Sequence, residues 1–186
     1  MPKDGSGLSL DGLGLPLWLV LELTYKCPLK CPWCSNPVDF DQYRNELTTE
    51  EWKKVLRAGR RLGSLQLGFT GGEPMLRNDL EELVAEADSL GYYTNLITSG
   101  VGLNKDRLRA LKKAGLKQVQ LSIQSNDRQH STKLVGVDVL DHKIDIARSI
   151  KAEGFPMVLN VPVSRFNIER TEALIDLADD LGVEYL

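Results

Sequence analysis

Residues 17–34 read LWLVLELTYKCPLKCPWC, in which an apolar run leads directly into three cysteines. The run at 17–23 is short and rich in β-favouring side chains, so it predicts a buried strand. The wider apolar stretch at 13–23 contains Gly14, Pro16 and Glu22 and falls short of the ~20 residues that a membrane helix needs. We therefore expect a strand of a soluble fold, with the cysteines at its carboxyl end.

Outward from this strand, short apolar runs alternate with longer amphipathic stretches along the chain. Further strands are predicted at 65–69, 93–98, 118–123 and 157–163, with a sixth beginning near Val183. Helices are predicted between them, at 48–62, 78–90, 105–114, 140–153 and 168–181. Repeated strand and helix units of this kind give a parallel sheet, either an open doubly wound sheet or part of a (β/α) barrel. The predicted fold class is α/β, with about six parallel strands.

The predicted helix ends carry residues that start and stop helices. Thr48 with Glu51 fits a capping box, and Asn78 with Glu81 is a looser version of the same motif. A glycine follows each of the five helices, where the backbone often turns left-handed: Gly63, Gly91, Gly115, Gly154 and Gly182. These local signals support the number of helices.

The composition is that of one ordinary domain: 186 residues, 42% of them hydrophobic and 26% charged, with a formal net charge of -3. Acidic and basic residues are interleaved, so neither a nucleic-acid surface nor a polybasic membrane patch is expected. Residues 1–14 are predicted to be a flexible N-terminus without the pattern of a secretory signal, and a cytoplasmic protein is expected. Residues 15–186 form the predicted domain, which we expect to be incomplete at its C-terminus because a sixth strand begins there.

The distinctive segments of the sequence follow the predicted strands, at the edge where ligands gather in parallel α/β sheets. The cysteines follow the first strand, and Thr-Gly-Gly-Glu-Pro at 70–74 follows the second. Thr-Ser-Gly at 98–100 follows the third strand, and Gln124 with Ser125 follows the fourth. The four loops are therefore expected to form one site.

All three cysteines of the chain lie within eight residues, at Cys27, Cys31 and Cys34, which disfavours a disulfide framework. Three soft thiolates on one loop suit a single compact metal centre. On a cluster of four irons they would leave one iron open to a chelating amino and carboxylate pair from a small molecule. An open zinc site, a dithiol pair of Cys31 and Cys34, and three inert cysteines are the alternatives.

The spacing Cys-x3-Cys-x2-Cys, with the aromatic Trp33 before the last cysteine, resembles the signature of the radical S-adenosylmethionine superfamily. Residues 71–74, Gly-Gly-Glu-Pro, look like its methionine-binding motif. Within the superfamily, residues 23–37, 93–102 and 119–124 are similar to the peptide cyclases of pyrroloquinoline quinone biosynthesis. The resemblance covers nearly the whole chain.

The resemblance implies a partial (β/α) barrel that holds a 4Fe-4S cluster on the three cysteines and binds S-adenosylmethionine. Reductive cleavage of this cofactor would give a 5′-deoxyadenosyl radical, which in the cyclases starts a carbon-carbon crosslink between a glutamate and a tyrosine of a precursor peptide. A small peptide chaperone and an external, flavodoxin-like electron donor are the implied partners. The cysteine-rich C-terminal extension of the cyclases, which holds auxiliary clusters, has no counterpart in these 186 residues.

The same resemblance suggests cofactor contacts in each of the four loops. Glu73 would accept from the methionine ammonium, which Gly71 and Gly72 would let approach closely, and Trp33 would pack on the adenine ring. The candidates for the remaining contacts to the cofactor are Pro74, Thr98, Ser99, Ser122 and Gln124. Ordinary turn chemistry and core packing are the competing explanations for these residues.

Two other functions remain open at this point. The first is a different radical enzyme of the same superfamily, acting on another peptide or on a small molecule. The second is a non-catalytic module in which the cysteines bind zinc or an electron-transfer cluster. The two histidines, His130 and His142, lie far from the cysteines in sequence, and their spacing indicates no metal site.

Overall fold

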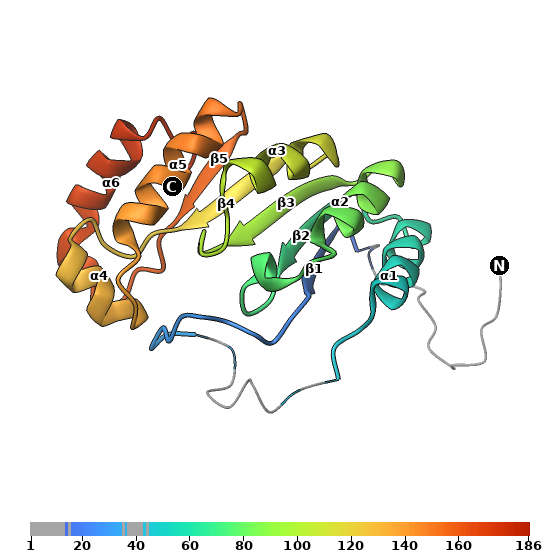
Figure 1. Ribbon diagram of the computed structural model, residues 1–186, viewed down its shortest axis with the longest axis horizontal. Coiled ribbons are helices and arrows are strands. Elements are labelled where there is room, and N and C mark those ends of the chain that lie inside the picture. The colour runs from blue at the N-terminus through green and yellow to red at the C-terminus, as the bar shows by residue number, and fades with distance from the viewer. Residues whose placement is uncertain (1–13, 15, 35, 37–42, 44) are drawn as a thin grey trace.

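The computed structural model describes residues 14, 16–34, 36, 43 and 45–186. Within them, five parallel strands form one sheet in the order β1-β2-β3-β4-β5, so each strand lies beside the next along the chain (Figure 1). The strands are β1 Trp18–Glu22, β2 Gln66–Thr70, β3 Tyr93–Thr98, β4 Gln118–Ser122 and β5 Met157–Asn160. This consecutive order is that of a barrel wall, because a doubly wound sheet reverses its strand order. The predicted α/β fold is confirmed, with a five-stranded sheet.

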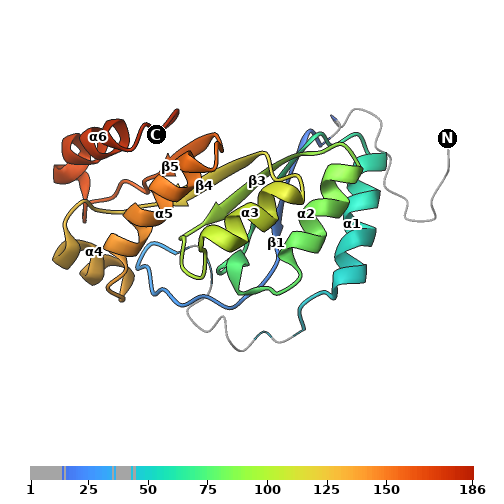
Figure 2. The ribbon, with the colours of Figure 1, turned by 45° about the horizontal axis from the view of Figure 1, so that its top comes forward.

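Helices connect the strands and cover one face of the sheet. In Figure 2, α1, α2, α3 and α5 lie side by side along that face, and each contacts the next. The helices are α1 Thr49–Arg61, α2 Leu80–Ser89, α3 Lys105–Lys113, α4 Arg128–Val135, α5 Leu140–Ala152 and α6 Thr171–Asp180. Two short 3-10 helices, η2 Pro74–Leu76 and η3 Ile168–Arg170, complete the described elements. No described helix combines the length and apolar character needed to span a membrane.

The hydrophobic core lies between these helices and the sheet. Alternate strand residues, such as Leu67, Leu96 and Val119, are buried against the helices, whose apolar stripes include Leu83 and Leu108. The opposite face of the sheet carries exposed apolar side chains, such as Trp18 and Val20, as well as polar ones. Asn95 Nδ2 of β3 donates to Gln120 Oε1 of β4 at 3.2 Å there. Because all the paired strands are parallel, their carboxyl ends, and the loops that follow them, lie along one edge of the sheet.

Most predicted helix ends are confirmed. Thr48 and Glu51 form the reciprocal bonds of a capping box at the start of α1. The five glycines after the predicted helices all have positive φ, between 63° and 100°. The predicted cap at Asn78 is wrong: α2 begins after Asp79, which makes no side-chain cap bond because its carboxylate holds Arg77.

Three differences from the predicted elements have local causes. Strand β5 ends at Asn160, three residues early, since Pro162 has no N–H to donate to a neighbouring strand. The predicted sixth strand is a single bridge between Tyr185 and Val158. Helix α4 was not predicted, although Gly136 ends it with a left-handed φ of 80°. Of the predicted flexible N-terminus, residues 1–13 lie outside the described residues.

Candidate functional site

The cysteine loop follows β1 and runs past the strand ends towards α4 (Figure 1). Cys27 and Cys34 are exposed and Cys31 is half-buried, so the three thiols lie at the surface of one short loop. The loop also contacts the part of the fold that follows β4, because Lys30 N donates to Val135 O at the end of α4 at 2.9 Å. Cys34 N donates to Cys31 O at 3.1 Å, which closes a turn between two of the thiols.

The loop after β2 lies against the backbone that precedes Cys27. Gly72 N donates to Thr24 O at 2.7 Å, and Glu73 N donates to Lys26 O at 2.8 Å. A Cβ on Gly72 would lie 2.2 Å from Lys26 O, and one on Gly71, whose φ is +140°, would lie 2.6 Å from Thr24 O. Both glycines are thus required by the contact between the two loops, independently of any ligand.

Glu73 is fully buried, and its carboxylate ties the β2 loop to the end of β3. It accepts from Met75 N at 3.0 Å, Thr98 Oγ1 at 2.6 Å and Ser99 N at 2.8 Å, and also from Ser99 Oγ. Burial raises the pKa of Glu73, and these hydrogen bonds oppose the rise because they favour the charged form. Two of the predicted cofactor residues, Thr98 and Ser99, therefore meet a third, Glu73, around one buried carboxylate.

A second polar cluster surrounds Lys143 of α5, at the end of β4. The ammonium is fully buried and donates to Ser122 O at 2.9 Å and to Gln124 Oε1 at 3.1 Å. Burial lowers the pKa of Lys143 to about 8, against the opposing charges of Cys31, Glu73 and Cys27. The predicted residues Ser122 and Gln124 thus share a cation that lies within electrostatic range of the cysteine loop.

The same charges act on the thiols. Partial desolvation by the surrounding residues raises the pKa of Cys27 and of Cys31, and the positive charge of Lys143 partly offsets the rise at both. The carboxylate of Glu73 raises the pKa of Cys27 further. Because metal binding requires thiolates, Lys143 favours the ligating form of these cysteines.

The structure separates the predicted residues into groups. Glu73 lies with Thr98 and Ser99, whereas Ser122 and Gln124 lie around Lys143. Pro74 is buried as the first residue of η2, and Trp33 is half-buried on the cysteine loop.

Lys143 was missed in the sequence, although a signal for it was present. It stands between the buried Leu140 and Ala147 at helical spacing, where a charge interrupts an apolar stripe.

The donor set fits a cluster with three cysteine ligands better than a zinc ion. Both ring nitrogens of His130 are engaged, by Ser125 Oγ at 3.0 Å and Phe166 O at 2.8 Å, and His142 Nε2 lies 3.0 Å from Gly100 O. Structural zinc takes four ligands at one point, whereas thiolates on a cubane each bind a different iron.

A parallel barrel wall, with a three-cysteine loop after its first strand and a Gly-Gly-Glu-Pro loop after its second, defines an iron-sulfur enzyme that uses S-adenosylmethionine. The family model of the Radical SAM superfamily matches residues 21–178. The chain belongs to this superfamily. Its cofactors are a 4Fe-4S cluster and S-adenosylmethionine.

Solved structures share the fold. SuiB from Streptococcus suis, bound to its precursor peptide SuiA, matches with a TM-score of 0.80 and 24% identity over 92% of this chain and 38% of its own. The enzyme anSMEcpe, with AdoMet and the Cp18Cys peptide, matches with a TM-score of 0.75 and 18% identity over 92% and 50%. Methylornithine synthase (PylB) has a TM-score of 0.65 and 19% identity over 79% and 44%. The chain spans half or less of the length of these proteins.

Proposed function

We propose that this chain is the radical-generating core of an enzyme that crosslinks a glutamate and a tyrosine of a precursor peptide in pyrroloquinoline quinone biosynthesis. The observation that carries the proposal is the contact of the cysteine loop with the Gly-Gly-Glu-Pro loop through two backbone hydrogen bonds, Gly72 N to Thr24 O and Glu73 N to Lys26 O. The sequence similarity at 23–37, 93–102 and 119–124 supports the particular reaction.

Cys27, Cys31 and Cys34 are the proposed ligands of the cluster. When bound, the cluster supplies the electron that cleaves S-adenosylmethionine into methionine and the 5′-deoxyadenosyl radical, which abstracts a hydrogen atom from the substrate. The chain must hold the cofactor in one orientation and keep water from the reacting atoms. A cluster held by the three thiols, all on one short loop, would lie beside the loops that follow β2, β3 and β4.

The remaining residues of the site would bind the cofactor by charge and shape. Glu73, with the Gly71 and Gly72 backbone, supplies negative charge for the methionine ammonium, and Lys143 supplies the positive charge for the carboxylate. Trp33 offers a flat apolar surface for the adenine ring. The proposed hydrogen-bonding and shape contacts to the rest of the cofactor are those of Pro74, Thr98, Ser99, Ser122 and Gln124.

The proposed substrate and partners follow from the same reaction. A precursor peptide is presented by a small chaperone, a flavodoxin-like protein supplies the electron, and the reaction takes place in the cytoplasm. SuiB, bound to its precursor peptide, and anSMEcpe, bound to the Cp18Cys peptide, share the fold and support a peptide substrate. The same two structures favour a second candidate function, another modification of a peptide by the same radical chemistry.

Anaerobic reconstitution with iron and sulfide, followed by an assay for 5′-deoxyadenosine, tests the radical chemistry. We expect iron to bind and the reduced protein to release 5′-deoxyadenosine from S-adenosylmethionine. Cys31→Ala should abolish both, whereas Lys26→Ala, which removes an exposed side chain of the same loop, should preserve both. Colourless protein that binds zinc in place of iron would contradict the proposal.

The peptide reaction requires a separate measurement. The precursor peptide, its chaperone, S-adenosylmethionine and the reduced enzyme are incubated together, and the mass of the peptide is followed. The expected result is the loss of two hydrogen atoms, with fragments showing joined glutamate and tyrosine side chains. The 5′-deoxyadenosyl radical takes one of these atoms, and the other leaves as a proton with its electron passed to a one-electron acceptor. A different mass change would support the second candidate function instead.

A further inference from the structure

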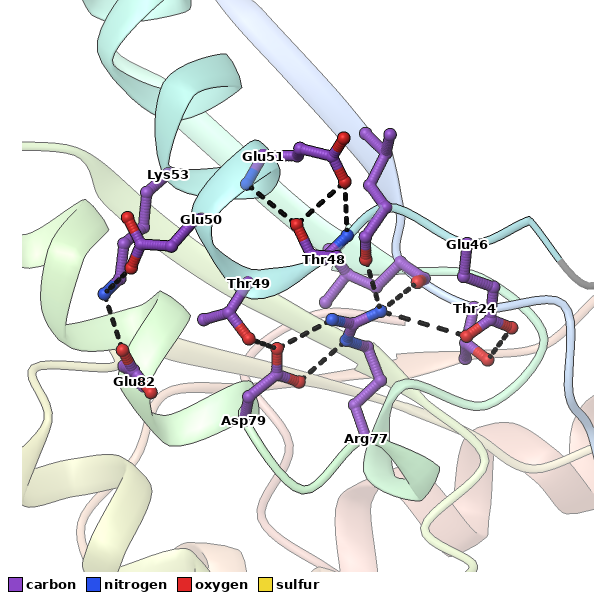
Figure 3. Close-up of polar contacts among 12 residues, drawn as sticks. Thr24, Glu46, Thr48, Thr49, Glu50, Glu51, Lys53, Arg77, Asp79 and Glu82 are labelled. Carbon is purple, nitrogen blue, oxygen red and sulfur yellow. Dashed lines mark hydrogen bonds and ion pairs between the residues drawn. The ribbon is translucent and has the colours of Figure 1, made fainter.

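Arg77, just after η2, contacts both ends of the segment that carries the cysteines. This segment leaves the sheet after β1 and returns at the start of α1. Arg77 Nη1 donates to Leu23 O at 3.0 Å and to Leu47 O at 3.2 Å, so one guanidinium group joins the outgoing and returning ends (Figure 3). Its side chain is only 11% exposed, which shields these bonds from competition by water.

Asp79 holds the guanidinium group in this orientation. It accepts from Arg77 Nε at 2.8 Å and from Nη2 at 2.7 Å, the paired geometry typical of arginine and carboxylate. Thr49 Oγ1 donates to the same carboxylate (Figure 3). Burial alone would raise the pKa of Asp79, but the hydrogen bonds from Arg77 and Thr49 outweigh it and lower the pKa.

Glu46, on the returning end, binds the two residues that come before Lys26 and Cys27. Its Oε1 accepts from Thr24 Oγ1 at 2.7 Å and from Tyr25 N at 2.9 Å, and its Oε2 lies 3.9 Å from Arg77 Nη1. Thr24 is 2% exposed, and its carbonyl is the one that accepts from Gly72 N. The carboxylate of Glu46 therefore fixes the backbone on which the Gly-Gly-Glu-Pro loop lies.

These contacts are not needed to start the neighbouring helices. Helix α1 already has its capping box of Thr48 and Glu51, and α2 receives no cap bond from Asp79. The two helices are also joined elsewhere, through Lys53 and Glu82 (Figure 3). The polar groups of Arg77 and Glu46 are directed at the ends of the cysteine segment instead.

We infer that Arg77 and Glu46 are positioning residues for the radical chemistry: they clamp the two ends of the cysteine segment and so fix the thiols relative to the Gly71–Glu73 loop. This inference rests on the proposed function. Loosening the clamp leaves the three thiols in the chain but alters where a cluster stands relative to the methionine group of the cofactor. The affinity for S-adenosylmethionine and the spectrum of the cluster therefore change more than the iron content does.

The test compares Glu46→Ala with Glu46→Gln in the reconstituted protein, with Glu50→Gln as a control on the exposed face of α1. Glutamine retains an oxygen that accepts from Thr24 and Tyr25, and alanine does not. We expect Glu46→Ala to raise the KM for S-adenosylmethionine about tenfold, the equivalent of one charge-assisted hydrogen bond. Glu46→Gln should recover most of this loss, and Glu50→Gln should match the wild type.

The electron paramagnetic resonance spectrum of the reduced cluster, recorded with and without S-adenosylmethionine, separates positioning from stability. Glu46→Ala should retain its iron but show a weaker spectral response to the cofactor. Arg77→Lys should do the same, because lysine has no planar fork to pair with Asp79 while a further nitrogen donates to the carbonyls of Leu23 and Leu47. Variants whose KM and spectra equal those of an active wild type would overturn the clamp. A wild type that holds iron but never cleaves the cofactor would overturn the proposed function instead, and the iron-bound spectra of the variants would still test the clamp.

Discussion

Replacement of Gly72 by alanine should break the contact between the cysteine loop and the Gly-Gly-Glu-Pro loop. The added Cβ would lie 2.2 Å from Lys26 O and 2.6 Å from Lys26 C, both backbone atoms. An ordinary contact between the added Cβ and these atoms requires a distance about 1 Å longer. Moving the two loops apart by that amount breaks the hydrogen bonds that Gly72 N and Glu73 N donate. Overpacking at 1–3 kcal/mol and two lost backbone bonds at about 1 kcal/mol each give an expected destabilisation of about 3–5 kcal/mol.

Urea unfolding of the iron-free protein, followed by circular dichroism, measures this loss. Gly91→Ala is a matched control, because Gly91 has a φ of +77° and no atom within 4 Å of an added Cβ. The control should lose about 1 kcal/mol through backbone strain alone. A Gly72→Ala protein that is no less stable than Gly91→Ala would refute the reasoning, since the clash with the Lys26 backbone would then cost no more than backbone strain alone. The iron content of reconstituted Gly72→Ala should fall in parallel.

Two further predictions concern α5 and α4. The folded pKa of Lys143 is about 8 and its ordinary value is 10.5, so the folded chain loses this proton first and the lysine's contribution to stability rises as pH increases between these values. The gain in the free energy of unfolding is up to about 3 kcal/mol. Urea unfolding of the iron-free wild type from pH 7.5 to 10 should show a rise in this free energy with pH that Lys143→Met lacks. Identical pH dependences of the two proteins would argue against a buried charge. Asp127→Ala removes the acceptor of His130 N at 2.7 Å and should destabilise the protein by about 1 kcal/mol, measured by the same method, with an unchanged urea midpoint as the contrary result.

The sequence was sufficient for the strand positions and most helix ends because their signals are local. The capping box of Thr48 and Glu51 lies within four residues, and each glycine after a helix acts through its own φ. Helix α4 carried comparable signals, Asp127 before it and Gly136 after it, but its eight residues are too few for a clear apolar period. Pro162 was a local signal for the end of β5 that the apolar run concealed.

The site was less predictable, because its contacts join residues that are distant in the chain. Gly71 and Gly72 were predicted to let the methionine ammonium approach closely, and the structure shows that the backbone of Thr24 and Lys26 also lies against them, which the sequence did not indicate. Arg77 donates to the backbone carbonyls of Leu23 and Leu47. Every residue has such a carbonyl, so the sequence does not single out these two. No sequence motif therefore identifies the clamp formed by Arg77 and Glu46.

The bond from Lys30 N to Val135 O ties the cysteine loop to a segment that is synthesised much later. The partner of this amide lies about a hundred residues further along, so this contact of the loop can form only once the chain has been synthesised as far as α4. Because synthesis proceeds from the N-terminus, the thiols leave the ribosome well before their final surroundings do. Iron delivered at that stage meets three cysteines without a scaffold, whereas iron delivered after release meets a prepared site.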